Sequence, residues 1–301
     1  MTAAPVLAAD LSSLVKRGEP LSRHTSWHVG GPAELYFTPR DRRDIGRILE
    51  ALPADVPVLW LGLGSNLLVR DGGVRGAVIA TGGALSRIER RDATSVYCEA
   101  GVPCALIARQ CVGWGLGPAE FFAGIPGTLG GALAMNAGAF GGETWNHVVG
   151  VEVIDRAGVE HARDAGAYTV GYRSVRAPAG DEGFLAATLR FERRPAAHAD
   201  EIRQLLGKRK ATQPIGAWSG GSTFTNPRGD HAARLIEAAG LKGHRIGGAS
   251  VSEKHANFII NHGDATAADI EALIRHVQAA VRAHAGIDLH PEVRIVGEST
   301  P

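Results

Sequence analysis

The chain has 301 residues, enough for two domains or three small ones. Its apolar fraction of 45% and charged fraction of 21% are those of an ordinary globular protein. A formal net charge of +1 excludes the strongly basic surface of a general nucleic-acid binder. No apolar run reaches the roughly twenty residues of a membrane helix, and no basic region precedes the short apolar stretch near the start. We therefore expect a cytoplasmic protein with neither nucleic acid nor membrane as a partner.

In chain order, helix-like and strand-like segments alternate without an internal repeat. Periodicity, capping residues and turn signals predict helices over 41–52, 103–115, 201–210, 231–240 and 266–286. Apolar runs bounded by turn residues predict strands over 56–62, 67–70, 76–81, 95–101, 148–155, 183–192, 257–261 and 292–297. The polar, alanine-rich segment 193–201 predicts a boundary near residue 195. The expected fold class is mixed α+β.

The three cysteines, Cys98, Cys104 and Cys111, form no CxxC pair, and an odd number is typical of a reducing compartment. Cys104 and Cys111 lie seven positions apart in a predicted helix and so share a face. We expect all three thiols to be buried and unreactive. The twelve histidines have no HExxH or other metal-ligand spacing, so no metal site is predicted.

The first candidate for chemistry is GLGSN, residues 62–66, directly after a predicted strand. Its glycines would let backbone N–H groups approach phosphate oxygens, with Ser65 and Asn66 as further donors. A tight turn between two strands explains the motif equally well. It is not the dinucleotide fingerprint GxGxxG, because position 67 is leucine and a strand follows, which disfavours a doubly wound nucleotide fold.

The second candidate is GIPGTLGGALAMNAGAFGG, residues 124–142, within a long segment that has Glu120 as its only acid. Bare backbone N–H groups beside apolar side chains suit a pyrophosphate next to a flat ring system. A glycine-rich packing loop is the alternative interpretation. In either case we expect this segment to be buried.

Several polar residues elsewhere are candidates with ordinary structural alternatives. Tyr172, Arg173 and Ser174 lie in YRSVR, Ser222 and Asn226 in GGSTFTNP, and Glu292 in HPEVRIVG. The same sequence would also be expected if Arg173 were a surface arginine, Ser222 a turn serine and Glu292 a glutamate at a strand end. Residues 241–261 offer Lys242, Lys254, His255 and Asn257 to a phosphorylated or sugar ligand, although a solvated loop has the same composition. Ser222 is not in GxSxG, so a serine hydrolase is not favoured.

Eight motifs in one order carry a family resemblance that spans about residues 20–297. They are RHTSWHVGGPAEL, LGLGSNLLV, GIPGTLGGALAMNAGAFGGE, YRSV, RKATQP, GGSTFTNP, AGLKGHRIGGASVSEKHANFIIN and HPEVRIVG. Together they closely resemble the UDP-N-acetylenolpyruvoylglucosamine reductase family, bacterial flavoenzymes of peptidoglycan precursor synthesis. The short separation of Arg173 and Ser222 resembles the shorter family form, which lacks an insertion with a substrate-capping tyrosine. His28 departs from the lysine or arginine of the family, so a charge-dependent contact from that position is in doubt.

The resemblance implies a vanillyl-alcohol-oxidase type of FAD-binding fold with a separate substrate domain. The expected boundaries are 1–81 and 82–195 for two FAD-binding subdomains and 196–301 for the substrate domain. FAD would be noncovalent, NADPH the electron donor, and the protein a monomer. The residues implied in cofactor binding are Gly62, Gly64, Ser65, Asn66, Leu67, Gly124, Ile125, Pro126, Gly127, Gly130, Gly131, Asn136, Ala137 and Gly138.

The family reaction reduces an enolpyruvyl ether to a lactyl ether, with hydride from N5 of reduced FAD to C3. By resemblance Arg173, Ser222 and Glu292 are the catalytic residues. A guanidinium suits the carboxylate and the charge that develops beside it, and Ser222 would give the proton to C2. Glu292 would assist electrostatically or share a proton, and to donate a hydrogen bond it needs a raised pKa. Tyr172, Lys210, Asn226 and Lys254 are expected to hold the phosphates and sugar of the substrate.

Two other functions are compatible with parts of the pattern. A different FAD-linked oxidoreductase of the same fold would reoxidise rapidly with oxygen. A noncatalytic protein that binds a nucleotide sugar would carry no flavin and would be colourless.

Overall fold

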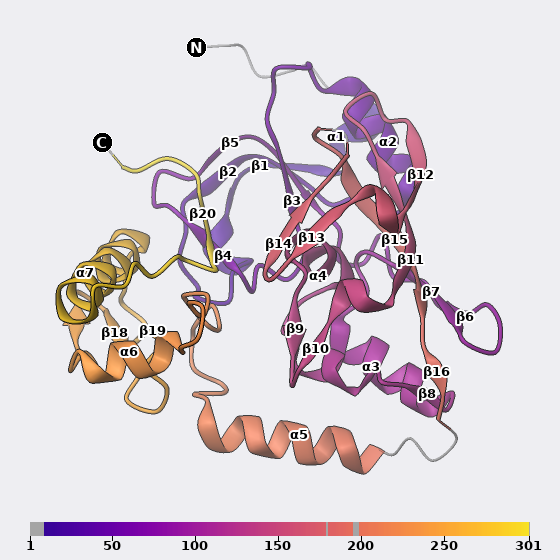
Figure 1. The fold of residues 1–301 in the computed structure, drawn as a ribbon. Coiled ribbons are helices and arrows are strands. Elements are labelled where there is room, and N and C mark those ends of the chain that lie inside the picture. The colour runs from indigo at the N-terminus through magenta and orange to yellow at the C-terminus, as the bar shows by residue number, and fades with distance from the viewer. Residues whose placement is uncertain (1–8, 179, 195–198, 301) are drawn as a thin grey trace. The chain divides into compact units, whose positions relative to one another are not determined.

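The structure is a computed structural model that describes residues 9–178, 180–194 and 199–300 (Figure 1). The predicted boundary at residues 195/196 and the first eight residues lie outside this part of the chain. The described residues form two compact units, each assembled from three chain segments. Unit 1 takes its described residues from Met1–Arg17, Leu35–Gly62 and Gly76–Gly207. Unit 2 takes them from Gly18–Glu34, Leu63–Arg75 and Lys208–Pro301.

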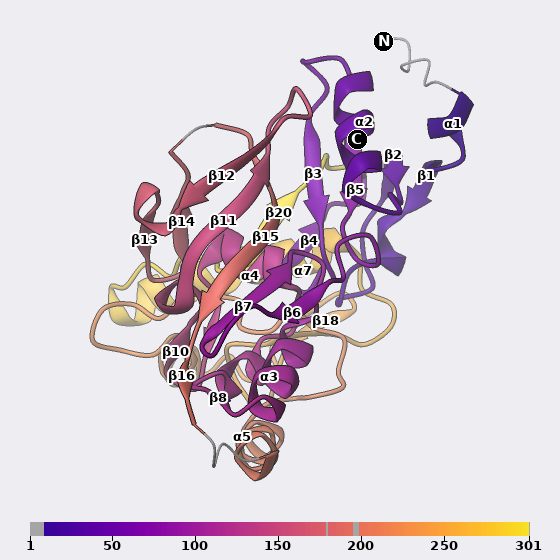
Figure 2. The ribbon, with the colours of Figure 1, turned by 90° about the vertical axis from the view of Figure 1, so that its right-hand side faces the viewer.

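Unit 1 contains a five-stranded antiparallel sheet in the order β12-β11-β15-β7-β6, whose strands lie side by side in Figure 2. The strands are β6 (Ile88–Arg90), β7 (Ser95–Glu99), β11 (Val148–Ile154), β12 (Glu160–Asp164) and β15 (Gly183–Arg190). Helix α3 (Cys104–Gly113) belongs to the same core, with Ile107 and Cys111 fully buried one turn apart. Burial of the Ile107 side chain alone contributes about 1.5–3 kcal/mol.

A second core of unit 1 forms around α2 (Arg42–Ala51). The side chains of Ile45, Ile48 and Leu49 share one helical face and are buried. They belong to the core that includes Phe37 of β2 (Pro32–Phe37) and Ile79 of β5 (Val74–Ala80). These strands belong to a sheet in the order β1-β2-β5-β3, with β1 at Val15–Pro20 and β3 at Val58–Leu61. Strand β3 pairs with β5 in parallel.

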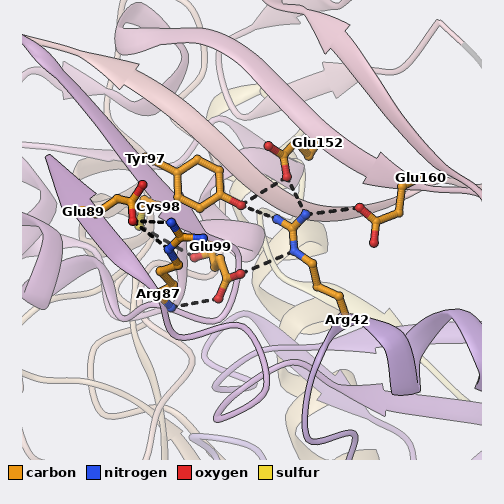
Figure 3. Close-up of polar contacts among 8 residues, drawn as sticks. All are labelled: Arg42, Arg87, Glu89, Tyr97, Cys98, Glu99, Glu152 and Glu160. Atoms are coloured by element: carbon orange, nitrogen blue, oxygen red, sulfur yellow. Dashed lines mark hydrogen bonds and ion pairs between the residues drawn. The ribbon is translucent and has the colours of Figure 1, made fainter. Parts of the chain in front are cut away.

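Arg42 connects the first turn of α2 to three strands of the five-stranded sheet (Figure 3). Its guanidinium forms ion pairs with Glu99 at 3.4 Å and Glu160 at 3.2 Å, and it also pairs with Glu152. It donates to the hydroxyl of Tyr97, which in turn donates to Glu152 over 3.1 Å. Burial, together with the neighbouring carboxylates, raises the pKa of Tyr97 to about 12. One cation thereby holds α2 against β7, β11 and β12.

Unit 2 has its own core around α7 (Ala267–Ala285), α6 (Ala232–Ala238) and the three-stranded sheet β17-β18-β19 (Figure 1). Ile270, Leu273, Ile274 and Val277 follow helical spacing on α7 and are buried. The strands are β17 (Arg245–Ile246), β18 (Ala249–Val251) and β19 (Ile259–Asn261), and β4 (Leu67–Val69) pairs in parallel with β20 (Arg294–Val296).

Two separate sets of acceptors bind the backbone N–H groups at the amino terminus of α7. Thr266 and Asp269 form a reciprocal capping box. The carboxylate of Asp71 accepts from the amides of Ala267 and Ala268, both at 2.9 Å. These amides would otherwise lack partners in the first helical turn. The capping fixes the segment after β4 to the start of α7.

The remaining elements are short, except for α5. They are α1 (Ala9–Ser12), α4 (Leu129–Met135), α5 (Ala199–Thr212), β8 (Leu116–Gly117), β9 (Gly138–Ala139), β10 (Gly142–Glu143), β13 (Thr169–Gly171), β14 (Ser174–Arg176) and β16 (Glu192–Arg193). Short 3-10 helices are η1 (Leu21–Arg23), η2 (Glu120–Gly124), η3 (Thr144–His147) and η4 (Ala165–Ala167). None of the helices in the described part of the chain has the length and apolarity needed to cross a membrane.

All predicted helices and strands are present, with ends within a few residues. The segment expected to be apolar and buried contains η2 and α4, with Phe122 and Leu129 fully buried. Its acid Glu120 is buried and lies 3.3 Å from Arg194. Cys98, Cys104 and Cys111 are free and fully buried, which confirms the predicted burial of the three thiols.

Candidate functional site

In unit 1 the predicted ligand-binding glycines meet around the start of α4. Gly62 follows β3, and a Cβ on Gly62 would lie only 2.5 Å from the hydroxyl oxygen of Thr128. Thr128 is 1% exposed, and its hydroxyl has no hydrogen-bond partner among the described residues. An unpaired buried hydroxyl beside a glycine is a suitable contact point for a polar ligand group.

Backbone hydrogen bonds fix the glycine-rich segment that leads into the first turn of α4. The carbonyl of Gly127 accepts from Cys104 N over 2.8 Å, and Gly130 N donates to Ala100 O over 2.7 Å. A Cβ on Gly130 would lie 3.1 Å from the Cβ of Ala100, so the missing side chain permits a close approach of α4. Of the other predicted residues here, Gly124 and Ile125 are buried, while Pro126 and Gly131 are exposed.

The rest of GLGSN belongs to unit 2, where the segment after Arg23 supports it. Gly64 has φ +60°, and a Cβ there would come within 2.0 Å of the carbonyl oxygen of His24. Ser26 N donates to Gly64 O over 3.3 Å, and the Ser26 hydroxyl donates to Ser65 O at 3.5 Å. This contact gives the RHTSW motif a supporting role that the sequence did not indicate.

Asn66 brings the GLGSN segment to Glu292. Its side-chain amide donates to the carbonyl oxygen of Glu292 over 3.1 Å, and its own carbonyl accepts from Arg294 N over 3.0 Å. Leu67 is buried in β4 and pairs with Arg294 of β20. In unit 2, Asn66, a predicted cofactor residue, is therefore hydrogen-bonded to Glu292, a predicted catalytic residue.

The GGSTFTNP loop is fixed on both sides of Ser222. Gly220 packs on Trp27, where a Cβ would approach the indole ring to 2.5 Å, and Gly221 has φ +77°. Thr223 N donates to Asn257 O, and Thr223 O accepts from Glu292 N, both over 2.8 Å. These bonds place the half-buried Ser222 in the same small region as the half-buried Glu292.

Asn257 clamps the same loop through its side chain. Its amide donates to Phe224 O over 2.8 Å and accepts from Phe224 N over 2.9 Å. At 4% exposure, Asn257 is a structural residue of the loop. His255 is half-buried, and burial lowers its pKa.

The predicted substrate residues of unit 2 take part in protein contacts. Asn226 is exposed, and its side-chain oxygen accepts from Ala232 N over 3.0 Å at the start of α6. Lys254 Nζ donates to the carbonyl of Lys210 over 2.6 Å, and both lysines are exposed.

In unit 1, Arg173 stands at the tip of the hairpin formed by β13 and β14. Its φ is +53°, and its guanidinium donates to Asn136 O over 3.2 Å and Gly138 O over 2.9 Å. The guanidinium carbon lies 5.0 Å from the centre of the Tyr172 ring, which is a cation–π contact. Ala137, between the two acceptors, is buried.

A cavity of about 440 Å³ adjoins this hairpin. Its lining includes Asn136, Glu143, Trp145 and Tyr172. Glu143 and Trp145 were not singled out from the sequence, although Glu143 follows the last glycine of the long glycine-rich segment. In its wall, the Glu143 carboxylate accepts from the Asn136 amide, and the Tyr172 ring is exposed beside them.

Two family models match separate parts of the chain. Residues 33–162 match the FAD binding domain family, and residues 213–296 match the UDP-N-acetylenolpyruvoylglucosamine reductase, C-terminal domain. The first match includes the glycine-rich segments and Asn136, and the second includes Ser222, Asn226, Lys254 and Glu292.

Similar proteins cover nearly the whole chain. A UDP-N-acetylenolpyruvoylglucosamine reductase of Alkalilimnicola ehrlichii is 57% identical, with 95% of each chain covered. One from Methylococcus capsulatus is 56% identical over 93% of this chain and 92% of its own. The crystal structure of the reductase from Thermus caldophilus matches with a TM-score of 0.79 and 34% identity, over 93% of this chain and 98% of that one. The chain therefore belongs to the UDP-N-acetylenolpyruvoylglucosamine reductase family.

Proposed function

We propose that this enzyme reduces the enolpyruvyl ether of a UDP-N-acetylglucosamine derivative to a lactyl ether, with FAD as cofactor and NADPH as electron donor. Family membership is the main support for this reaction. The structural observation that carries the proposal is the pair of bonds that Glu292 makes, from its N–H to Thr223 O and from its carbonyl to the Asn66 amide. They bring Asn66, a predicted cofactor residue, and Thr223, the neighbour of the predicted catalytic Ser222, to the predicted catalytic Glu292.

The residues around α4 fit a flavin nucleotide. The unpaired hydroxyl of Thr128 offers a hydrogen bond, and the glycines at 62 and 130 let the backbone pack closely around it. A Cβ on Gly131 would meet no other atom within 4 Å, so this exposed backbone is also accessible. We propose that Gly62, Gly64, Ser65, Asn66 and Leu67, the backbone of 124–131, and Asn136, Ala137 and Gly138 hold noncovalent FAD.

The bound flavin supplies the electron pair for the reduction. Arg173 balances the substrate carboxylate and the negative charge that develops beside it, because a guanidinium stays ionised and offers paired donors. Ser222 donates its hydroxyl proton to C2, and the hydrogen bonds on Thr223 hold it in place for that transfer. Glu292 assists from the adjoining segment by sharing a proton, which requires a raised pKa. Tyr172, Lys210, Asn226 and Lys254 contact the sugar and phosphates.

Three broader features complete the proposal. Residues 1–81 and 82–195 are the two FAD-binding subdomains, and 196–301 is the substrate domain. The protein works as a monomer. It works in the cytoplasm, in agreement with three free and buried thiols.

Substitution of Ser222 by alanine tests the proton donor. We expect reduction of the bound flavin by NADPH to stay within about twofold, and reoxidation by the enolpyruvyl substrate to slow by at least about 100-fold. Anaerobic stopped-flow absorbance of the flavin measures both steps separately. Thr225→Ala is the control in the same loop, because its hydroxyl bonds to His290 O and has no proposed chemical role. Unchanged reoxidation in Ser222→Ala would remove Ser222 from the mechanism.

A further inference from the structure

Arg173 adopts a backbone conformation that needs support. A positive φ of +53° is unfavourable for a residue with a long side chain, by about 1–2 kcal/mol. The guanidinium also reaches back to two carbonyl groups, those of Asn136 and Gly138. The direction in which Arg173 presents its charge therefore depends on the turn that carries these carbonyls.

Asn136 is the centre of that turn. It ends α4 with φ +47°, a conformation that asparagine tolerates better than most residues. Its side chain is buried, with the residue only 1% exposed. The amide group donates to Gly171 O over 3.1 Å and to Glu143 Oε2 over 3.0 Å, and its oxygen accepts from Trp145 N over 3.1 Å.

Asn136 is linked both to the guanidinium of Arg173 and to the backbone of the hairpin that carries Arg173. The main-chain carbonyl of Asn136 accepts from the guanidinium, while its side chain holds Gly171, two positions before Arg173 in the hairpin. Asn136 thus fixes the base of the hairpin and the head of the arginine at the same time. Its amide donors are both used within the protein.

Glu143 is the acceptor that orients the Asn136 amide. It lies on β10 directly opposite Gly138 of β9, whose carbonyl binds Arg173. A Cβ on Gly138 would come within 2.2 Å of Gly142 O and 3.2 Å of the Arg173 guanidinium, so the glycine allows this close arrangement. The Glu143 carboxylate also lines the 440 Å³ cavity.

We propose that Asn136 and Glu143 are positioning residues, which fix the Arg173 guanidinium in the orientation needed to bind the substrate carboxylate. The inference rests on the role proposed above for Arg173. Loss of the Glu143 acceptor leaves a buried N–H of Asn136 without its partner and releases the turn that carries both carbonyls. Substitution of a residue that orients a directly acting group typically changes activity by about 10–100-fold.

The test compares Glu143→Ala with Glu143→Gln in the FAD-loaded enzyme. Alanine should slow flavin reoxidation by the enolpyruvyl substrate about 10–100-fold, while NADPH-driven reduction stays within about twofold. Glutamine keeps an oxygen that can accept from Asn136, so we expect reoxidation within about threefold of the parent enzyme. Glu89→Ala, which removes a carboxylate of β6 from its ion pairs with Arg87 and Arg91, should leave both steps unchanged.

A double variant, Glu143→Ala with Arg173→Ala, distinguishes failure of the positioning role from failure of the function proposed for Arg173. In that background Glu143→Ala should have no further effect on reoxidation, since the positioned group is gone. If Arg173→Ala slows reoxidation and Glu143→Ala does not, the positioning role is wrong and the role of Arg173 stands. If Arg173→Ala has no effect, both are wrong.

Two further outcomes would overturn the positioning role. One is a Glu143→Gln enzyme as slow as Glu143→Ala, because charge rather than the hydrogen bond would then matter. The other is equal loss of both half-reactions with loss of bound flavin, which would indicate cofactor binding. Should Glu143→Ala fail to fold, Asn136→Gly removes the same amide and still permits the positive φ. It should reproduce the selective loss of reoxidation.

Discussion

At the scale of single residues, several polar side chains proposed as ligand contacts also hold the protein itself. Asn136 uses its amide to support the Arg173 hairpin, and Asn226 accepts at the start of α6. Lys254 binds the carbonyl of Lys210. Residue types suited to ligand recognition are equally suited to satisfying backbone groups. The sequence identifies such residues as candidates, but only their contacts in the structure distinguish ligand binding from support of the backbone.

The buried thiols give a prediction for single residues. Burial raises the pKa of Cys98 and Cys104 and raises that of Cys111 to about 12, which keeps all three protonated near neutral pH. We expect a thiol reagent to modify none of them in the native protein at about pH 8, and all three in denaturant. An exposed control, Ser86→Cys, should react at once. Rapid labelling of the native parent protein would contradict the prediction.

At the scale of elements, the longer amphipathic helices could be predicted from the sequence. The prediction of 41–52 corresponds to α2 at Arg42–Ala51, and 266–286 corresponds to α7 at Ala267–Ala285. Both have a polar cap and an apolar face of several residues, which is a strong local signal. The strand pair β4 and β20 was also located, although its parallel pairing was not.

Elements that depend on distant contacts were missed. Helix α4 reads LGGALAM, and its two glycines weaken any helical signal. Strands β9, β10, β13 and β14 have two or three residues each, too few for a pattern of alternation. These are the elements that hold Arg173 and Asn136. Motifs in the sequence therefore identify candidate residues, whereas the short elements that support them have no local sequence signal.

The ion pair between Arg70, directly after β4, and Glu271 of α7 gives a prediction at this scale. Arg70 donates to both oxygens of Glu271 at 2.8 and 3.0 Å, and these hydrogen bonds lower the pKa of Glu271. The pKa of Glu271 is lower in the folded protein than in the unfolded chain, where it is about 4.3. The pair therefore contributes its full stabilisation of unit 2 at pH values above about 4.3. This contribution is lost as the pH falls through the folded pKa.

Glu271→Gln should consequently lower the free energy of unfolding by about 1–3 kcal/mol at neutral pH. The difference from the parent protein should shrink at about pH 3, where both proteins lack the charge. Urea unfolding followed by circular dichroism at the two pH values measures it. Glu237→Gln removes the more exposed pair with Lys242 and should cost less than about 1 kcal/mol. A Glu271 effect that grows on acidification would contradict the assignment.

At the scale of the whole molecule, the cofactor should stabilise the fold. FAD binds the native protein and not the unfolded chain, so free FAD at about 100 times its Kd adds about 2.7 kcal/mol. We expect removal of FAD to lower Tm and its addition to restore it, as measured by calorimetry. Riboflavin, which lacks the pyrophosphate, is the control and should restore less. An identical Tm with and without FAD would contradict the proposed cofactor site.

The parallel pairing of β4 with β20 also constrains how the protein is made. Residues 67–69 leave the ribosome long before residues 294–296, since about 225 residues separate the two strands in the chain. At about 5–20 residues per second, the first strand waits roughly 10–45 s for its partner. During translation β4 lacks this partner, and unit 2 can be completed only after residues 294–296 have been made. The edge of β4 therefore stays exposed for this whole interval, which is the kind of unpaired strand edge that favours aggregation.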